Sequence, residues 1–260
     1  MLFIMVLFAA APFAAMVWFS LFGESGNIPE VHFDTYAYIF ARDTGIWRSC
    51  GVTFLYALGT ALPGAVLMSM FGYALSRKKM ICRNFFYIFL FLAAVLGSGG
   101  ISLYILATKY LHIENTLWVY ILPHLVSPWY VLMTALFFRS VPGVIIDAAV
   151  ADGAGEGQMF FCVALPMAKP VVATLLILIF ISRWNDWKSA VMYIDDAKLK
   201  NIQYYIYELN MKNEIVTKTG RDITGGVRFA SAVMGVVPAV AALPFFGKYL
   251  AGGIICGGLK

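Results

Sequence analysis

Long apolar segments, each about the length of a membrane-crossing helix, recur along this sequence. A helix needs about 20 residues to cross a bilayer, and the first such segment, residues 1–22, carries no charged side chain. Hydrophobic residues make up 61% of the chain and charged residues only 13%, whereas soluble domains carry about 25% charged residues. These values argue against a disordered chain and against a soluble enzyme. We therefore expect an all-α membrane protein with several spans.

Six transmembrane helices account for the apolar segments. Their expected bounds are about 1–22, 50–76, 84–107, 117–138, 170–190 and 229–247. Two longer polar stretches separate the later spans, one at 139–169 and one at 191–228. We expect a single transmembrane domain over 1–260, with both termini on the same side of the membrane.

The basic residues indicate the orientation of these spans. Residues 77–83, between the second and third spans, hold four Lys or Arg side chains. Dense positive charge beside a span marks the cytoplasmic side. This rule places both termini and the stretch 139–169 in the cytoplasm, and the stretch 191–228 outside.

An amphipathic helix is expected in the outer stretch. Four apolar residues recur there at the spacing of one helical face: Ile202, Tyr205, Ile206 and Leu209. Such a helix lies at the membrane interface or against a partner protein. Residues 213–226, which follow it, are expected to form a flexible loop.

The sequence lacks the motifs of an enzyme that could drive transport. It contains no GxxxxGK[ST] loop for nucleotide phosphates, no HExxH and no GxSxG. The four cysteines lie far apart without a CxxC pair, so we expect neither a zinc site nor a disulfide framework. We predict no bound cofactor or metal, and the scattered basic residues give no sign of nucleic-acid binding. A transport protein of this kind needs an ion gradient or a separate ATPase.

The cytoplasmic stretch 139–169 is too polar and glycine-rich to cross a bilayer. Ser140 is a suitable N-cap, and Pro142 suits the first turn of a helix. Gly153 can take the left-handed conformation that ends such a helix. A short helix is therefore expected between these residues.

A second short helix is expected over 156–164, with Pro166 ending it. The first helix is rich in alanine and therefore thin, and Asp147 and Asp152 give it an acidic edge. That shape fits a groove with basic residues on a soluble partner. The alternative is a helix lying flat on the bilayer.

The residues from 147 to 154 resemble the EAA loop of ABC importer permeases. In that family an acidic residue and two alanines are followed, three positions later, by Gly-Ala, and a proline comes further on. The matching residues are Asp147, Ala148, Ala149, Asp152, Gly153, Ala154 and Pro166. The resemblance implies that this segment is the coupling helix that docks on the ATPase. Asp147 replaces the usual Glu and keeps the charge on a side chain one methylene shorter.

Further segments resemble the carbohydrate-uptake branch of these permeases. They are residues 73–77, 115–123, 184–194 and 248–260. The resemblance implies a type I importer in the bacterial inner membrane. Its expected parts are this chain, a second permease subunit as heterodimer partner, two ATPase subunits that use ATP and Mg, and an extracytoplasmic sugar-binding protein.

Residues near the end of the fifth span are candidates for the translocation path. The candidates are Arg183, Trp184, Asn185, Asp186, Trp187 and, in the fourth span, His124. Ionisable groups such as Arg183 and Asp186, placed within a span, usually face a cavity or a partner. Trp184 and Trp187 could stack on sugar rings, or they could belong to an interfacial aromatic belt. His124 is either a ligand or a hydrogen-bonded packing residue.

These features together predict the membrane-spanning permease subunit of an ATP-driven sugar importer. Such a subunit couples and conducts by alternating access, without performing covalent chemistry. An ion-coupled secondary transporter is the main alternative, and it would favour inverted repeats, of which the sequence shows no clear sign. The hypothesis of a membrane-embedded hydrolase is weakened because the sequence lacks a GxSxG motif and a histidine paired with it.

Overall fold

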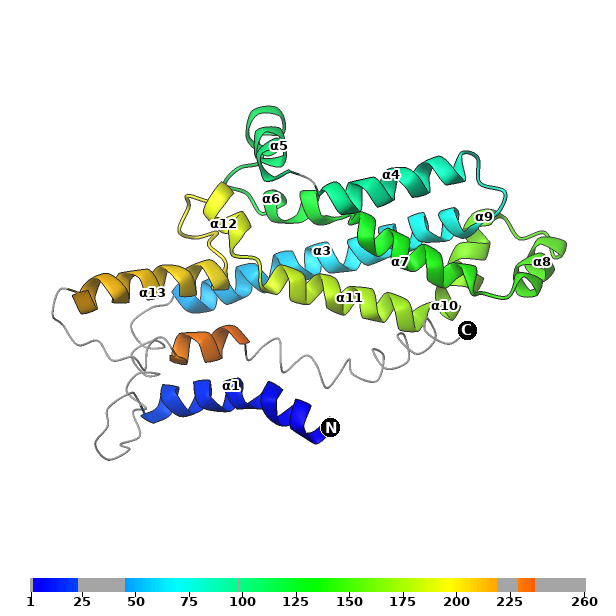
Figure 1. The fold of residues 1–260 in the computed structure, drawn as a ribbon. Helices are drawn as coiled ribbons and strands as arrows, with labels where there is room; N and C mark the ends of the chain where they lie inside the picture. Colours follow the sequence, from blue (N-terminus) through cyan, green and yellow to red (C-terminus); the bar gives the residue numbers. More distant parts are fainter. Residues whose placement is uncertain (1, 23–44, 98, 219–228, 237–260) are drawn as a thin grey trace. The chain divides into compact units, whose positions relative to one another are not determined.

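The computed structural model describes residues 2–22, 45–97, 99–218 and 229–236. Every regular element in these ranges is a helix (Figure 1), which confirms the expected all-α class. The chain divides into two compact units. Unit 1 comprises Met1–Thr53 and Trp184–Ala242, and unit 2 comprises Phe54–Arg183 and Leu243–Lys260. The expectation of one transmembrane domain over 1–260 stays a prediction.

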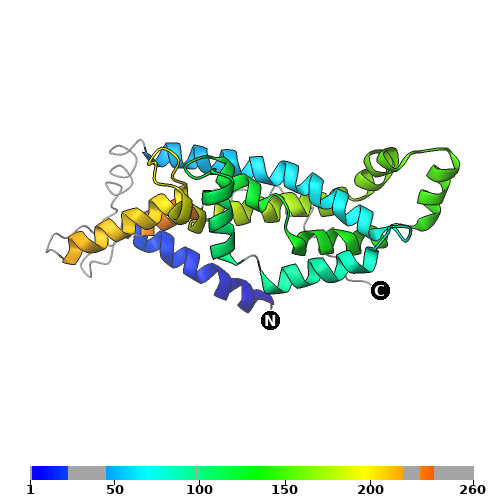
Figure 2. The same ribbon diagram turned by 90° about the horizontal axis from the view of Figure 1, so that it is seen from above.

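Unit 2 contains most of α3 and the helices that follow it along the chain. They are α3 (Gly45–Ser76), α4 (Arg83–Leu96), α5 (Gly100–Ile105), α6 (Trp118–Ile121), α7 (Pro128–Arg139), α8 (Gly143–Ala151), α9 (Glu156–Gln158), α10 (Leu165–Met167) and α11 (Lys169–Trp184). Turns of π-helix cover Leu106–Tyr110 and Met159–Ala164, and a 3-10 turn covers Leu122–His124. Figures 1 and 2 show α3, α7 and α11 running alongside one another.

Small apolar side chains let α3, α7 and α11 approach closely. Their buried cluster contains Ala61, Ala65, Met68, Leu75, Val131, Ala135, Leu175 and Ile179. Gly72 of α3 is one reason for the close approach, since a Cβ built there would lie only 2.8 Å from the amide nitrogen of Ala135. The hydroxyl of Thr134 lies 3.1 Å from the carbonyl oxygen of Met68. Small residues and hydrogen bonds of this kind are how helices pack inside a membrane.

Several of the expected spans are broken helices. Among the described residues, α3 alone is long and apolar enough to cross a membrane by itself. Three bent pairs also qualify if each pair is taken as one span: Arg83–Leu96 with Gly100–Tyr110, Trp118–His124 with Pro128–Arg139, and Glu156–Met167 with Lys169–Trp184. The expected first span coincides with α1 (Leu2–Phe22). Most of the expected sixth span lies outside the described residues.

Proline and glycine account for two of these breaks. Ser127 has extended backbone angles, φ −110° and ψ 122°, before Pro128 at the start of α7, because the helical region is disfavoured for a residue that precedes proline. The bend there is 45°. Gly97, with φ +71°, ends α4. The expected third and fourth spans therefore contain local changes of direction that hydrophobicity does not reveal.

Unit 1 contains α1, the first turns of α3, α12 (Lys188–Tyr193), α13 (Ile202–Lys218) and a helical segment over 229–236. Buried Asn201 begins α13, because its side-chain oxygen accepts the amide of Tyr204 at 2.9 Å. The amide of Ile202 donates to the hydroxyl of Thr53 at 2.9 Å. The expected amphipathic helix is confirmed and is longer than predicted. Residues 213–218, expected in a loop, are helical, while 219–226 lie outside the described residues.

The expected fifth span, 170–190, is interrupted. α11 ends at Trp184, and α12 begins only at Lys188. The carboxylate of Asp186 accepts the amide of Ser189 at 3.2 Å and its hydroxyl at 2.7 Å. A short acidic side chain that accepts the amide three residues later favours a new helix start over continuation of the old one, which explains the interruption.

Candidate functional site

Helix α8 carries the predicted docking residues, and none of its side chains is buried. Val144 is 79% exposed and Val150 is 46% exposed. Asp147 and, directly after the helix, Asp152 are exposed as well. Figure 1 places α8 at one end of unit 2, beside α9 and α10. In the chain alone, this helix therefore presents uncovered apolar side chains flanked by acidic groups, which is typical of a surface that contacts another protein or a membrane.

The glycine after α8 closes the helix. Gly153 has φ +80°, a conformation that costs a residue with a side chain about 1–2 kcal/mol. Its amide donates to the carbonyl of Val150, and the amide of Ala154 donates to the carbonyl of Ala149, both at 3.0 Å. These two bonds form a Schellman motif. The predicted left-handed glycine is confirmed, and Ala148 lies on the exposed surface of the same helix.

The start of α8 differs from the prediction. Ser140 closes the preceding helix α7, because both its amide and its hydroxyl donate to the carbonyl of Phe137, at 2.9 Å and 2.7 Å. Pro142 takes the N-cap position of α8, with ψ 126°. The prediction that Ser140 caps α8 is therefore wrong. The reason is that α7 extends far enough to leave Ser140 in its own last turn.

Pro166 does not end the second short helix as expected. Helical backbone continues from Glu156 through a π-helical turn and into α10, where Pro166 occupies the first turn. A proline is tolerated there because the first turn needs no amide donor. The change of direction comes at Ala168, with φ −87° and ψ 6°, and the helices on either side of it bend by 81°.

The segment after α8 is fastened to α3 and α7 by packed aromatic rings. Tyr73 of α3, Phe138 of α7 and Phe160 are all buried in one cluster. The ring of Tyr73 lies 5.6 Å from that of Phe138 and 5.4 Å from that of Phe160. The guanidinium of Arg77 also lies 3.8 Å from the carboxylate of Glu156. Since packed interiors transmit displacement with little compression, movement of this segment is passed on to α3 and α7.

The candidate path residues fall in both units. Arg183 and His124 belong to unit 2, whereas residues 184–187 belong to unit 1. The hydroxyl of buried Tyr56 donates to the carbonyl of Arg183 at 2.8 Å, which anchors the end of α11 on α3. His124 is half-buried and ends the 3-10 turn before α7.

The two tryptophans differ in their surroundings. Trp184 is only 3% exposed, and its indole N–H donates to the carbonyl of Gly235 at 2.9 Å. Trp187 is 40% exposed and stacks on Tyr207, with 5.4 Å between the rings. Of these two tryptophans, Trp187 has the more exposed ring, and it is the one that could stack on a sugar.

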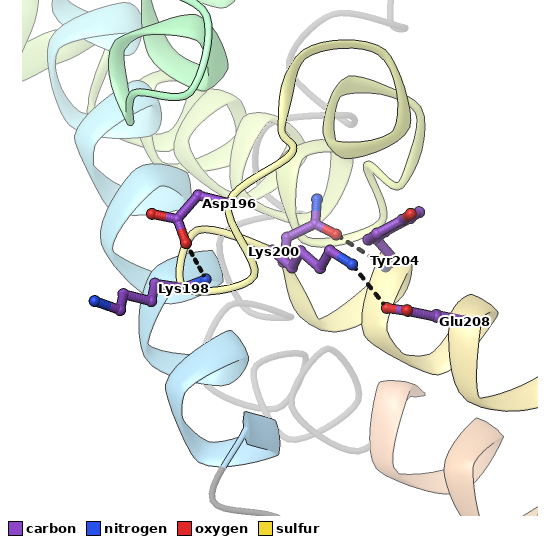
Figure 3. Close-up of polar contacts among 6 residues, drawn as sticks. Asp196, Lys198, Lys200, Tyr204 and Glu208 are labelled. Atoms are coloured by element: carbon purple, nitrogen blue, oxygen red, sulfur yellow. Dashed lines mark hydrogen bonds and ion pairs between the residues drawn. The ribbon is translucent and has the colours of Figure 1, made fainter.

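The neighbouring polar residues brace the loops around this tryptophan. The side-chain oxygen of exposed Asn185 accepts a hydrogen bond from the side-chain nitrogen of Gln203 at 3.4 Å. Figure 3 shows the loop that leads into α13. In that loop Asp196 accepts the amide of Lys198 at 2.8 Å. Lys200 lies 3.0 Å from the Glu208 carboxylate and 4.9 Å above the ring of Tyr204.

The sequence reasoning missed the residues that hold these sites in place. Tyr73, Phe138 and Phe160 gave no local signal, because their rings meet only once the spans have packed. The same holds for Tyr56, whose partner lies at the far end of α11. The start of α12 did carry a signal, namely an acidic residue three positions before Ser189.

Comparison with known proteins defines the class of the chain. Residues 35–253 match the family described as binding-protein-dependent transport system inner membrane component. The chain belongs to this family, and it is therefore a membrane component of such a transport system. This membership favours the predicted permease over an ion-coupled transporter or a hydrolase.

Particular relatives come from bacteria. Protein LplC of Bacillus subtilis is 30% identical over 234 residues, which cover 87% of this chain and 78% of LplC. The polygalacturonan/rhamnogalacturonan transport system permease protein YtcP of the same species is 28% identical, with 87% of this chain and 81% of YtcP covered. The arabinooligosaccharides transport system permease protein AraQ of Halalkalibacterium halodurans is 27% identical, with 87% and 79% covered.

A solved structure shows the same fold. It is a bacterial ABC transporter involved in the import of the acidic polysaccharide alginate. One of its chains matches with a TM-score of 0.81 and 21% identity, and the match covers 96% of this chain and 93% of that chain. The expected type I importer permease fold is thereby confirmed.

Proposed function

We propose that this chain is the permease subunit of an ATP-driven importer for an oligosaccharide or polysaccharide fragment. Its membership of a binding-protein-dependent transport family supports the role in transport. The names of YtcP and AraQ and the alginate importer all refer to carbohydrate polymers or oligomers, which supports a carbohydrate cargo. The partners are a second permease subunit, two ATPase subunits and an extracytoplasmic sugar-binding protein.

ATP and Mg are used by the ATPase subunits, and this chain performs no hydrolysis itself. The chain lies in the bacterial inner membrane, with α8 and both termini facing the cytoplasm. The dense basic segment 77–83 supports this orientation, because it adjoins α9 through the pair of Arg77 and Glu156.

The exposure of α8 is the observation that carries the proposal. Val144, Ile145 and Val150 are large apolar residues at 79%, 40% and 46% exposure, an arrangement that a free helix end in water would not favour. A groove on the ATPase would cover these side chains, and basic residues there would pair with Asp147 and Asp152. ATP-driven closure of the ATPase pair then moves α8.

The motion reaches the spans through the packed rings after α8. Phe160 follows α8 and is packed against Tyr73 of α3 and Phe138 of α7. Displacement of α8 therefore tilts these helices and alternates access between the two sides of the membrane. Of the two candidate tryptophans, exposed Trp187 is the better placed to stack on a sugar ring. The polar candidates for the translocation path are Arg183, Asn185, Asp186 and His124.

Charge reversal at α8 tests the proposal. The chain is co-expressed with its partner permease and tagged ATPase, and the amount retained on the tag is measured. We expect Asp147→Lys to lower retention about tenfold, since a charged contact contributes roughly 1.5–3 kcal/mol. Glu114→Lys makes the same charge change at another exposed carboxylate and should leave retention unchanged. Equal retention of the wild type and Asp147→Lys would refute the docking role.

A further inference from the structure

A pocket of about 400 Å³ opens in unit 2 where α3 ends. Its wall comes from the last two turns of α3, the segment that follows, and the helical turns that begin with α9. The lining residues used below are Met70, Ala74, Arg77, Lys79, Glu156 and Phe161. The docking surface of α8 is separate, because no residue of that helix lines the pocket.

One side of the pocket is apolar and uncovered. Met70 is 41% exposed and Phe161 is 53% exposed. Phe71, beside Met70, is also 53% exposed. On a helix that crosses the membrane, exposed apolar groups of this kind suit contact with acyl chains.

The rim of the pocket is basic. The side chain of Arg77 is only 22% exposed, lies 3.8 Å from Glu156 and stands 5.7 Å above the ring of Tyr73. The one carboxylate of the pocket therefore already has a cationic neighbour. Lys79 is exposed, and it contacts no carboxylate within the part of the chain that the structure describes. The rim thus keeps an excess positive charge.

A basic rim above an apolar wall matches the two ends of a phospholipid. Cationic side chains bind phosphate oxygens through charge-assisted hydrogen bonds. Basic pockets at the cytoplasmic ends of spans take anionic head groups, because the inner leaflet carries negative lipids. A zwitterionic phospholipid has no net charge, because its own cationic group balances its phosphate, so it would gain less from the excess charge of Lys79.

We propose that this pocket binds one anionic phospholipid of the cytoplasmic leaflet, with its phosphate on Arg77 and Lys79 and its chains along Met70 and Phe161. The proposal rests on the proposed function only for the side of the membrane on which α3 ends. A lipid bound there would brace the segment between the coupling helix and α3.

Native mass spectrometry of the assembled transporter, with its partner permease and ATPase subunits, tests the site. The complex is titrated with phosphatidylglycerol or phosphatidylcholine, and the tightly retained lipid is counted. We expect retained phosphatidylglycerol in the wild type and about fivefold weaker retention in Lys79→Gln. Lys78→Gln is the matched control, since Lys78 is also exposed but is not among the residues that line the pocket.

A second variant fills the pocket without changing charge. Ala74→Phe places a ring in the cavity and should abolish the retained lipid. Val66→Phe adds a ring on the exposed surface of the same helix, outside the pocket, and should leave retention unchanged. Three results would each overturn the proposal. They are equal retention of both lipids, equal losses of lipid in Lys78→Gln and Lys79→Gln, and a cross-link between the pocket and the ATPase. ATPase retention is read in the same spectra, so a failure of docking is distinguished from a failure of lipid binding.

Discussion

The guanidinium of Arg77 lies 3.8 Å from the carboxylate of Glu156, and this ion pair joins the end of α3 to the first residue of α9. The Glu156 side chain is 69% exposed, so water and salt screen the attraction strongly. The pair therefore holds the segment after α8 only loosely. Such a contact is able to break and re-form in each transport cycle.

A double-mutant cycle measures the strength of this pair. We expect Arg77→Gln and Glu156→Gln to be coupled by less than about 1 kcal/mol in the unfolding of the purified complex. The low value follows from the exposure of Glu156. A coupling energy above about 2 kcal/mol would instead indicate a rigid link between α3 and α9.

Glycine at position 153 is expected to be needed for ATPase binding. Gly153→Ala forces a side chain into a left-handed conformation, which costs about 1–2 kcal/mol and frays the end of α8. ATPase retention should fall about fivefold or more. Gly153→Asp adds a charge to the same strain, and we expect it to abolish ATPase binding and transport while membrane insertion stays normal.

Two alanine variants at other glycines test whether the loss of ATPase binding requires backbone strain at the end of α8. Gly155 has φ −70° and open space at its Cβ, so Gly155→Ala should leave ATPase retention unchanged. Gly97 has φ +71° and ψ 165°, a region essentially confined to glycine, so Gly97→Ala introduces at least as much backbone strain far from α8 in the sequence. If Gly97→Ala weakened ATPase retention as much as Gly153→Ala, general destabilisation would explain both results.

The close approach of α3 and α7 gives a stability prediction. In Gly72→Ala, the new Cβ would lie 2.8 Å from the backbone nitrogen of Ala135, and backbone has little freedom to move aside. Overpacking of this kind costs about 1–3 kcal/mol, so the thermal midpoint of the purified protein should drop. Gly51→Ala on the same helix meets nothing within 4 Å, and it should not lower that midpoint, because alanine is the better helix former.

The same substitution at two tryptophans should have different effects on stability. Trp184→Phe removes the N–H that donates to buried Gly235, and we expect a loss of about 1 kcal/mol in chemical unfolding. Trp187→Phe changes a side chain that is 40% exposed, and its effect should stay within about 0.5 kcal/mol. Comparable losses at both positions would contradict the difference in burial.

Local signals predicted helix α8 and its glycine end well, because they determine this local structure. The glycine at 153 and the alanines before it specify a thin helix with a left-handed end, and this structure needs no distant contact. Ser140 was misassigned because its capping potential is equally satisfied at the end of α7. One local pattern therefore fitted two helices, and the length of α7 decided between them.

Contacts between distant segments were beyond the reach of the sequence. The sequence does not distinguish Trp184 from Trp187, whereas in the structure the first is buried and donates to the carbonyl of Gly235 and the second is exposed. The cluster of Tyr73, Phe138 and Phe160 likewise depends on how three helices pack. Breaks in the spans arise from Pro128 and Gly97, whose effect on direction cannot be read from hydrophobicity.

The two backbone hydrogen bonds that close α8 at Gly153 have both their donors and their acceptors within residues 149–154. The carbonyls of Ala149 and Val150 therefore have hydrogen-bond donors without any contribution from the rest of the subunit. Residues 142–155 should therefore keep their helical structure when they are exchanged for the corresponding segment of a related subunit. On the proposed docking role, related subunits could therefore come to bind different ATPases while their translocation pathways stay the same.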